Sequence, residues 1–441
     1  MSEMNGMTRK LAEFLVRTDQ ATIPAEMFEH AKVAFLDFLA VTYGGKDDPL
    51  VDKLIAYAEL MGGKEQASLI GQGMKRSMEQ AALINGAASH ALDYDDTLVS
   101  FLGHPSVTIF PSLLALSQVR GKSGRDFLGA YLIGLQVGGT IGACAGLDHY
   151  LAGWHATSTL GHLASAAACA RLIGLNEQQS LYALGIAATM SSGLKRNFGT
   201  MVKPFHAGRA AAGGLMAALL AESGFTAAED ALEGPQGFFE CLKGKVNEQI
   251  LGFLGLGWDV VNLSQKYHAS CHATHSPLEA AREIVAENKI AISDIEKIVV
   301  HSSEVTMQAA KNPDPKTGLE GKFSVPFCVA NALLQENTGM AAFTDERVND
   351  PAVRALVKKI SVVKDPAKTA LEATVEITVK GGKTFTGFSD ILQKIPPLEK
   401  KQANVRVKFQ DMASAVVGAA RAEELARKVD GLLENPDISA L

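Results

Sequence analysis

The stretch Leu160-Gly-His-Leu-Ala-Ser-Ala-Ala-Ala-Cys-Ala-Arg-Leu172 decides the fold class. The residues after it predict a helix that stops at Gly174 and a new helix capped by Asn176. Alanine and glycine crowd the neighbouring segments in the same way, which indicates close helix–helix contact around a dense core. We therefore expect a mainly helical protein.

Helical patterns extend outward from this stretch over residues 7 to about 250. Pro24 suits the first turn of a helix and precedes apolar residues at helical spacing. The pattern predicts helices over residues 24–40, 79–90, 106–119, 125–144, 160–172, 176–190 and 207–222.

The sequence pattern changes from helical to mixed helix and strand after about residue 260. Two β-branched runs cover residues 295–301 and 373–380, and the second leads into the hairpin turn Gly381-Gly382. Helical stretches at 276–288 and 323–334 lie between them, and a helical tail covers 399–433. We expect an all-helical domain over 1–265, with 400–441 packing back on it, and an α+β lid domain over 266–399.

Composition narrows the class of function. A chain of 441 residues usually forms two domains, and 47% apolar with 20% charged residues is typical of a globular protein. The net charge of -6 gives no overall attraction to nucleic acid or acidic lipid, so an anionic substrate would need a local group of cations. Five scattered cysteines do not form a disulfide framework and suit a reducing compartment, so we expect a cytoplasmic protein.

One uncharged stretch, Phe127 to Leu147, is long enough to cross a bilayer. It contains Gln136 and many small residues, so a buried, closely packed helix explains it equally well. No second span or basic flank supports a membrane segment, and the N-terminus lacks the apolar core of a signal peptide. We expect no membrane partner.

Four segments concentrate polar residues, and the first is Asp93-Tyr-Asp-Asp-Thr97 followed by Gly103-His-Pro-Ser106. This first segment is either a solvated, self-capping turn or a site on a loop between helices.

The second segment is Gly153-Trp-His-Ala-Thr-Ser-Thr-Leu-Gly-His162. Its histidines could be ordinary core residues, but Trp154 would lower the polarity around His155 and could shift its titration.

The third segment, Lys195 to Arg209, places four cations and a histidine before an apolar helix expected to begin near Ala207. Cations at a helix N-terminus are unfavourable unless an anion binds there. This segment therefore predicts an anion site, with Lys203 as the main candidate for contact with a carboxylate or for proton transfer.

The fourth segment is Lys266-Tyr-His-Ala-Ser-Cys-His-Ala-Thr-His275. Its imidazoles and thiol are zinc-ligand types, although their spacing fits no common zinc pattern. The alternative is a polar rim at the domain junction.

Taken together, these segments resemble the MmgE/PrpD family, which includes 2-methylcitrate dehydratase, cis-aconitate decarboxylase and iminodisuccinate epimerase. The matching stretches are 91–97, 103–106, His155 with Gly161, Lys203-Pro-Phe-His-Ala-Gly208, 266–275 and Gly321-Lys-Phe-Ser324. The resemblance implies a large helical domain with a smaller α+β lid, a homodimer, no cofactor and a small polycarboxylate substrate. It implies catalytic roles for Asp93, His104, His155 and Lys203, and substrate contacts from Thr97, Lys266, Arg209, Cys271, His275 and Ser324.

The expected reaction begins with loss of a proton next to a carboxylate, with His155 and His104 as base and acid in either order. A lid hinged near 262–270 would exclude water. In the decarboxylase branch a histidine falls at Cys271, where dehydratase-like members have cysteine. The cysteine favours a 2-methylcitrate dehydratase-like hydro-lyase, with epimerase or decarboxylase activity as alternatives. The loop from Thr97 to His104 is shorter than in typical 2-methylcitrate dehydratases, which leaves the exact substrate open.

Three other classes of protein remain open. A zinc enzyme would use ligands from His268, Cys271, His272 and His275. A terpene-cyclase-like enzyme would use Asp93-Tyr-Asp-Asp96, although 6% aromatic residues would line a carbocation site poorly. A non-catalytic carboxylate-binding or membrane-associated protein would use the 127–147 stretch as an anchor.

Overall fold

The computed structural model describes residues 6–310, 312–369 and 371–439. These divide into two compact units. Unit 1 takes its residues from 1–91, 95–265 and 397–441, and unit 2 contains 92–94 and 266–396. Helix accounts for 61% of the described residues and strand for 9%, which confirms the mainly helical prediction.

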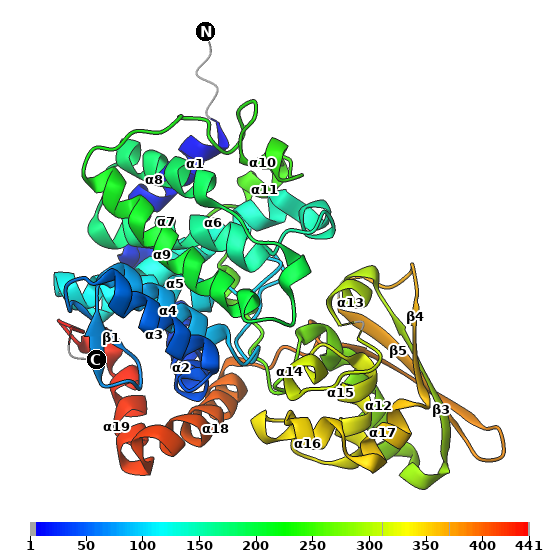
Figure 1. The fold of residues 1–441 in the computed structure, drawn as a ribbon. Coiled ribbons are helices and arrows are strands. Elements are labelled where there is room, and N and C mark those ends of the chain that lie inside the picture. The colour runs from blue at the N-terminus through cyan, green and yellow to red at the C-terminus, as the bar shows by residue number, and fades with distance from the viewer. Residues whose placement is uncertain (1–5, 311, 370, 440–441) are drawn as a thin grey trace. The chain divides into compact units, whose positions relative to one another are not determined.

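Unit 1 is helical apart from one short antiparallel hairpin, Ala67–Leu69 (β1) with Met74–Arg76 (β2) (Figure 1). Its longer helices are α1 (Met7–Arg17), α2 (Ala25–Gly45), α3 (Pro49–Met61), α4 (Met78–His90), α5 (Ser106–Arg120), α6 (Gly124–Leu151), α7 (Ala156–Ile173), α8 (Glu177–Met190), α9 (Val202–Glu222), α18 (Leu398–Val417) and α19 (Ala419–Asp430). Two short helices, α10 (Phe238–Cys241) and α11 (Glu248–Gly252), complete it.

The centre of unit 1 is a stack in which α7 packs against both α6 and α9, and α9 also packs against α4. The predicted end of α7 is confirmed, because Gly174 has a left-handed backbone with φ of 89°. The predicted start of α8 is also confirmed. Asn176 accepts from the Gln179 amide, and the Gln179 side chain accepts from the Asn176 amide in return.

Helices α4 and α9 cross at two glycines. A Cβ atom on Gly208 would lie 2.1 Å from the carbonyl oxygen of Leu83, and one on Gly86 would lie 2.8 Å from the Cα of Gly208. Only glycine permits this approach, because the obstacle is backbone that cannot rotate away. The crossing holds the C-terminal end of α4, with His90, in the same core as α9.

Helix α6 contains the uncharged stretch that could have been a membrane span. In the part of the chain that the structure describes, it is the one helix long and apolar enough to cross a bilayer, and 94% of its most apolar window is buried. Its small residues contact other helices closely, as where a Cβ on Gly134 would meet Ala168 at 2.5 Å. These contacts favour the interpretation of this stretch as a core helix.

The predicted start of α9 is wrong. The helix begins at Val202 instead of near Ala207, so Lys203 and His206 project from the helix and not from a preceding loop. Pro204 is compatible with this start, because a proline in the first turn costs no hydrogen bond: the first N–H groups of a helix have no partner within it.

The C-terminal tail returns to unit 1, where α18 packs along α2. A buried ion pair joins them, with Lys408 Nζ 2.7 Å from Asp37 Oδ1.

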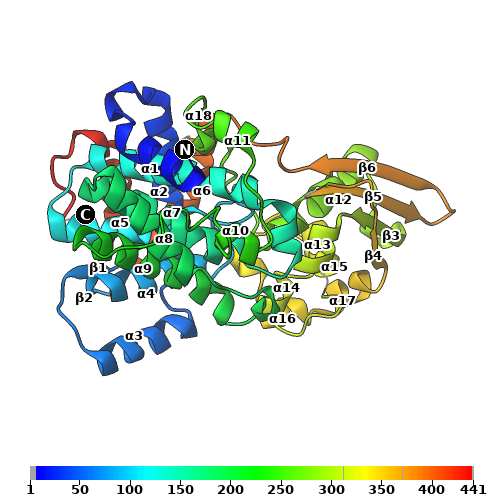
Figure 2. The same ribbon diagram turned by 90° about the horizontal axis from the view of Figure 1, so that it is seen from above.

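Unit 2 contains a four-stranded sheet in the order β4-β3-β5-β6 (Figure 2). The strands are β3 (Ile295–Ser302), β4 (Ile360–Lys364), β5 (Glu372–Val379) and β6 (Thr384–Asp390). Strands β3 and β4 are parallel and the other pairs antiparallel. The predicted hairpin is confirmed, and Gly381 and Gly382 have the positive φ that its turn requires. The pattern did not predict β4, which is short and largely exposed.

Helices cover the sheet of unit 2. Helix α12 (His275–Asn288) packs on β5 and β6, and α15 (Val325–Leu334) packs on α12 and β4. The remaining helices of this unit are α13 (Glu304–Ala309), α14 (Gly318–Gly321), α16 (Asp345–Val348) and α17 (Pro351–Val357).

The α4–α9 crossing gives a stability prediction. Gly208→Ala should lower the free energy of unfolding by about 1–3 kcal/mol or more, because the added methyl group meets the Leu83 carbonyl. The matched control is Gly252→Ala in α11, where nothing lies within 4 Å of the added Cβ. Denaturant unfolding should show a lower midpoint for the first variant and little change for the second. Equal midpoints would contradict this account of the crossing.

Candidate active site

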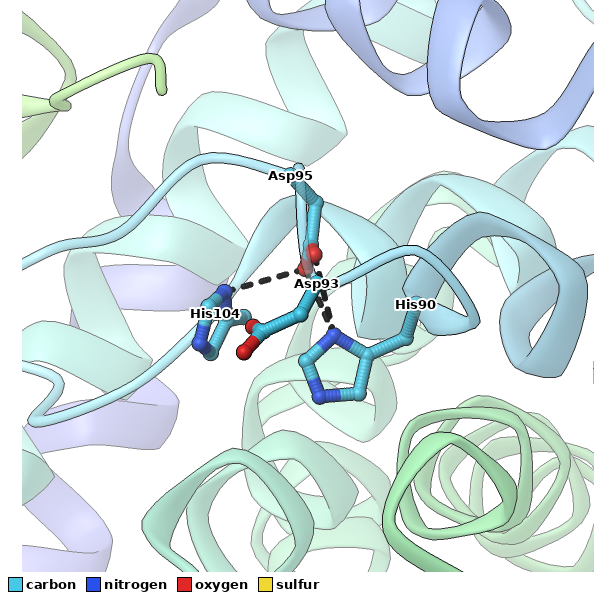
Figure 3. A group of neighbouring side chains, drawn as sticks. All are labelled: His90, Asp93, Asp95 and His104. Atoms are coloured by element: carbon cyan, nitrogen blue, oxygen red, sulfur yellow. Dashed lines mark hydrogen bonds and ion pairs between the residues drawn. The ribbon is translucent and has the colours of Figure 1, made fainter. Parts of the chain in front are cut away.

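A buried carboxylate between two imidazoles forms the first part of the site in unit 1. His90 is the last residue of α4, and its Nδ1 lies 2.8 Å from Asp95 Oδ2. His104, just ahead of α5, places its Nδ1 3.0 Å from the same oxygen (Figure 3). All three residues are buried. The interpretation of this loop as a solvated turn is therefore wrong, and its carboxylates are internal.

The second part is a pair of histidines on α7 and α9. His155 precedes the first turn of α7, and its Nδ1 lies 3.0 Å from Nδ1 of His206. The rings of His155 and His90 are stacked with centroids 5.9 Å apart, so the pair adjoins the carboxylate group. The sequence indicated a role for His155 but none for His206. His206 lies one helical turn before Ala210 on the buried face of α9, and this spacing could have identified it as an internal histidine.

Lys203 supplies the cation of this region. It lies in the first turn of α9 and is 5% exposed. Its Nζ is 5.4 Å from the ring centroid of Phe198, and that ring meets His155 edge-on at 4.8 Å. Phe198, and not Trp154, is therefore the aromatic neighbour of His155, since the Trp154 ring stacks on His149.

Burial sets the resting charge of the imidazoles. It lowers the pKa of His155 well below its usual value, and the nearby charge of Lys203 adds to this effect. Burial and then Lys203 likewise lower the pKa of His206 to about 4. Burial lowers the pKa of His90 to about 4 despite the opposing effect of Asp95. These three rings are therefore neutral at physiological pH.

Asp95 has the opposite behaviour. Burial alone would raise its pKa, but the imidazoles of His104 and His90 outweigh burial and hold the pKa well below the usual value of 3.8.

Asp96, the next residue, points into the core instead. It accepts a hydrogen bond of 2.5 Å from Ser106, whose hydroxyl also contacts the Tyr131 hydroxyl at 2.7 Å. Burial, and then the neighbouring Asp37, raise the pKa of Asp96 to about 8, so this carboxyl group is protonated at neutral pH.

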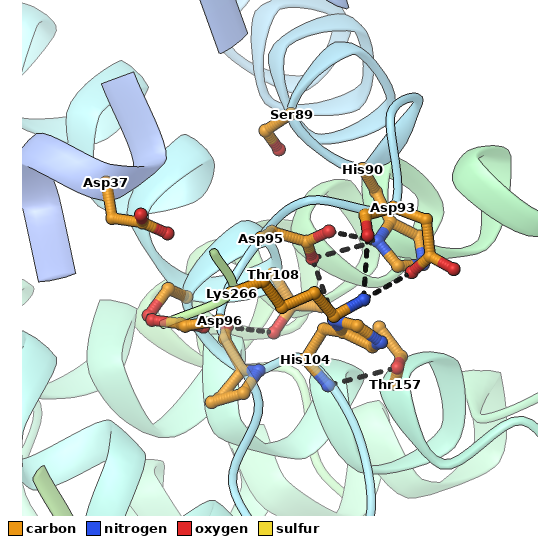
Figure 4. Close-up of polar contacts among 12 residues, drawn as sticks. Asp37, Ser89, His90, Asp93, Asp95, Asp96, His104, Thr108, Thr157 and Lys266 are labelled. Atoms are coloured by element: carbon orange, nitrogen blue, oxygen red, sulfur yellow. Dashed lines mark hydrogen bonds and ion pairs between the residues drawn. The ribbon is translucent and has the colours of Figure 1, made fainter. Parts of the chain in front are cut away.

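Asp93 belongs to unit 2, although it lies between residues of unit 1 in the chain. Lys266 Nζ donates to Asp93 Oδ1 at 2.8 Å and to its backbone carbonyl at 2.7 Å (Figure 4). Lys322 Nζ donates to the carbonyl of Leu92 at 2.5 Å. Both lysines are buried, and together they hold the 92–94 segment. The sequence had marked Lys266, but it had noted Lys322 only as part of the 321–324 resemblance.

The three carboxylates of the Asp93-Tyr-Asp-Asp96 motif have different partners. Asp93 is paired with a lysine, Asp95 lies between two imidazoles, and Asp96 is bound to a hydroxyl in the core.

Two other predicted residues of unit 1 have partners outside the group formed by Lys203, His155 and His206. Arg209 is 3.7 Å from Glu79, and its side chain is 39% exposed. Thr97 pairs through its backbone with Ser264, in an antiparallel bridge with N···O distances of 2.9 Å. The structure therefore does not bring Arg209 into the group formed by Lys203 and the histidines.

The other predicted residues lie in unit 2. His275 begins α12, and its ring contacts those of His268 and His272 with centroids 4.8 and 4.6 Å apart. Cys271 is partly buried, and its amide donates to the Lys322 carbonyl. Ser324 caps α15 by accepting from the Phe327 amide.

Two groups of histidines contain residues of metal-ligand types. In the proposed zinc set, His268 uses both ring nitrogens in other contacts, one with Thr338 at 2.6 Å and one with Glu279 at 2.7 Å. The ligand atoms of His90, Asp93, Asp95 and His104 all lie within 4.8 Å of one another. Nδ1 of each of these two rings lies at a carboxylate oxygen of Asp95.

The site therefore combines neutral imidazoles, one ionised carboxylate beside His104, and a buried ammonium. A neutral imidazole can accept a proton, and an imidazole beside a carboxylate can donate one. A fixed cation stabilises negative charge that develops on a bound anion. The arrangement suits acid–base chemistry on an anionic substrate.

Comparisons with known proteins agree with this chemistry. The MmgE/PrpD N-terminal domain model matches residues 9–250 and the MmgE/PrpD C-terminal domain model matches 268–432. Cis-aconitate decarboxylase of Aspergillus terreus is 28% identical over 99% of this chain and 95% of that protein. The Mus musculus enzyme of the same name is 28% identical over 94% of this chain and 88% of that protein. The 2-methylcitrate dehydratase of Escherichia coli is 27% identical over 66% of this chain and 64% of that protein.

Asp96 gives a test of stability against pH. Its pKa is about 8 in the folded protein and 3.8 when unperturbed, so between these values the unfolded chain releases a proton that the folded protein keeps. The contribution of Asp96 to stability therefore falls as pH rises through this range. Asp96→Asn should gain in melting temperature relative to the unsubstituted protein as pH is raised from 5 to 8.

The neighbouring Asp95→Asn is the matched control. The pKa of Asp95 is depressed in the folded protein, so the Asp95 carboxylate stabilises the fold above pH 3.8 and loses this effect on acidification. Asp95→Asn should lower the melting temperature at pH 7, with a smaller difference below pH 4. The same pH trend in both variants would contradict these charge assignments.

Proposed function

Because this chain belongs to the MmgE/PrpD family, we propose that it is a hydro-lyase acting on a small hydroxy tricarboxylate such as 2-methylcitrate. The relatives named above are decarboxylases and dehydratases, and both are lyases. The proposed reaction removes a proton from the carbon next to a carboxylate and expels the hydroxyl group as water.

The observation that carries this proposal is that two imidazoles of one buried group have different partners. His155 is neutral because of its burial, which leaves it able to accept a proton. His104 instead places its Nδ1 3.0 Å from a carboxylate oxygen of Asp95. We assign His155 as the base and His104 as the acid that protonates the departing hydroxyl. Dehydration needs both groups at once.

Lys203 takes the role of electrostatic stabiliser in this scheme. Removal of the proton places extra negative charge on the adjacent carboxylate of the substrate. A buried ammonium already fixed in α9 requires little rearrangement to meet that charge. Its position next to the ring that accepts the proton also helps to keep that ring neutral.

Decarboxylation of a cis-aconitate-like acid is the second candidate, because the matches to decarboxylases extend over almost the whole chain. That reaction requires a cation and a proton donor but no separate base. The cysteine at position 271, where the decarboxylase branch is expected to have histidine, favours dehydration.

A substrate panel separates these reactions. The protein is incubated in D₂O with methylcitrate, citrate, cis-aconitate and iminodisuccinate, and the products are followed by NMR. Loss of water from methylcitrate supports the first proposal, CO₂ release from cis-aconitate the second, and deuterium exchange with inversion at iminodisuccinate an epimerase. No conversion and no exchange with any of the four acids would overturn the proposal.

His155→Gln should lower turnover of the preferred acid about 10²–10⁴-fold, the usual share of general acid–base catalysis. The melting temperature should change little in comparison. The matched control is His162→Gln, which removes another buried imidazole of α7 whose Nδ1 is bonded to the Ser158 carbonyl. Nearly full activity in the His155 variant, or equal losses in both, would show that His155 is not the base.

A further inference from the structure

The two imidazoles proposed as acid and base differ in what their Nδ1 atoms contact. Nδ1 of His104 meets a carboxylate oxygen of Asp95, and Nδ1 of His155 meets the Nδ1 of His206, each at 3.0 Å. A carboxylate favours the charged form of an imidazole, whereas a neutral imidazole only orients it. The contacts thus provide two different environments for chemically identical side chains.

Counting hydrogens in the His155–His206 pair restricts its tautomers. The two Nδ1 atoms face each other, so only one can carry the hydrogen between them. If His155 donates it, its Nε2 carries a lone pair and the Nε2 of His206 carries a hydrogen. If His206 donates, the hydrogen on the His155 ring moves to Nε2 and that ring can no longer act as a base there.

We propose that His206 is a positioning residue that accepts the Nδ1 hydrogen of His155 and so holds Nε2 of His155 ready to take the substrate proton. This inference rests on the proposed function, since it concerns the base of that reaction. The contact between the two rings uses Nδ1 of each, so Nε2 of His155 is the nitrogen that the pair leaves for the substrate.

The proton balance of the step is simple. Nε2 of His155 takes the proton, and the electron pair of the C–H bond stays on the substrate carbon. The ring becomes an imidazolium, and its Nδ1–H bond to His206 becomes charge-assisted and therefore stronger. When the proton leaves Nε2, the ring returns to its starting tautomer.

A neutral partner suits a base in this environment. The charged and titratable groups facing His155 are Lys203 and His206 on α9, His90 at the end of α4 and His104 before α5. None of them is an anion. A carboxylate in the position of His206 would instead favour a proton on His155 at rest.

The tautomer can be measured without any substrate. Protein labelled with ¹⁵N in histidine would be examined by long-range ¹H–¹⁵N NMR, with the His155 signals assigned from their loss in His155→Gln. We expect His155 to carry hydrogen on Nδ1 and a bare Nε2 at pH 7, with the reverse at His206. A hydrogen on Nε2 of neutral His155 would overturn the inference.

Three substitutions then test the role in turnover. In His206→Asn the amide oxygen can still accept from Nδ1 of His155, so kcat should stay within about threefold and the tautomer should persist. His206→Ala should lower kcat roughly ten- to a hundredfold, less than loss of the base itself. His206→Asp should move the acidic limb of the kcat/KM profile upward by about one pH unit or more.

The pH profile distinguishes this role from simple packing, because a packing defect lowers activity without moving the titration of His155. An unchanged profile in a folded His206→Asp protein would overturn the inference. The NMR result is independent of turnover: if no acid in the panel reacts, the proposed function fails, while the tautomer of His155 still decides the role of His206.

Discussion

The close approach of α4 and α9 is the constraint on which the rest of unit 1 depends. Glycines at 86 and 208 bring the two backbones into contact, and α7 packs along the other side of α9. Without side chains to separate them, these helices bring His90, His155 and His206 into one small volume. The abundance of alanine and glycine in this region is therefore a condition for the site as well as for the core.

Burial of titratable groups at this density has a cost that must be compensated by specific partners. Asp95 is compensated by imidazoles, and Lys266 by Asp93, which lies in the same unit. Asp96 instead keeps its proton and is therefore uncharged, and the Ser106 hydroxyl donates a hydrogen bond to it. The neighbouring carboxyl groups of Asp95 and Asp96 thus hold different charge states, because each meets a different partner. Such divergence of titration is what acid–base catalysis requires.

The 92–94 segment belongs to unit 2, although the residues on both sides of it in the chain belong to unit 1. Asp93 and Leu92 are held by the buried lysines Lys266 and Lys322, while the flanking residues His90 and Asp95 belong to unit 1. The left-handed backbone of Asp93, with φ of 51°, marks the point where the chain turns between the two sets of contacts. A non-glycine residue is held in that conformation only where the surroundings over-determine it.

The sequence by itself determined the helices, the α7 stop and α8 start, the β5–β6 hairpin, the family and the segments that carry chemistry, because these depend on local patterns and short spacings. It could not determine which side chains contact one another. Whether Asp93 or Asp95 meets an imidazole, whether Arg209 points inward, and that His206 lies against His155 all depend on how helix faces are rotated toward residues far away in the chain. The misplaced start of α9 shows the limit. A shift of a few residues changes which side chains share a face, and only tertiary packing decides that rotation.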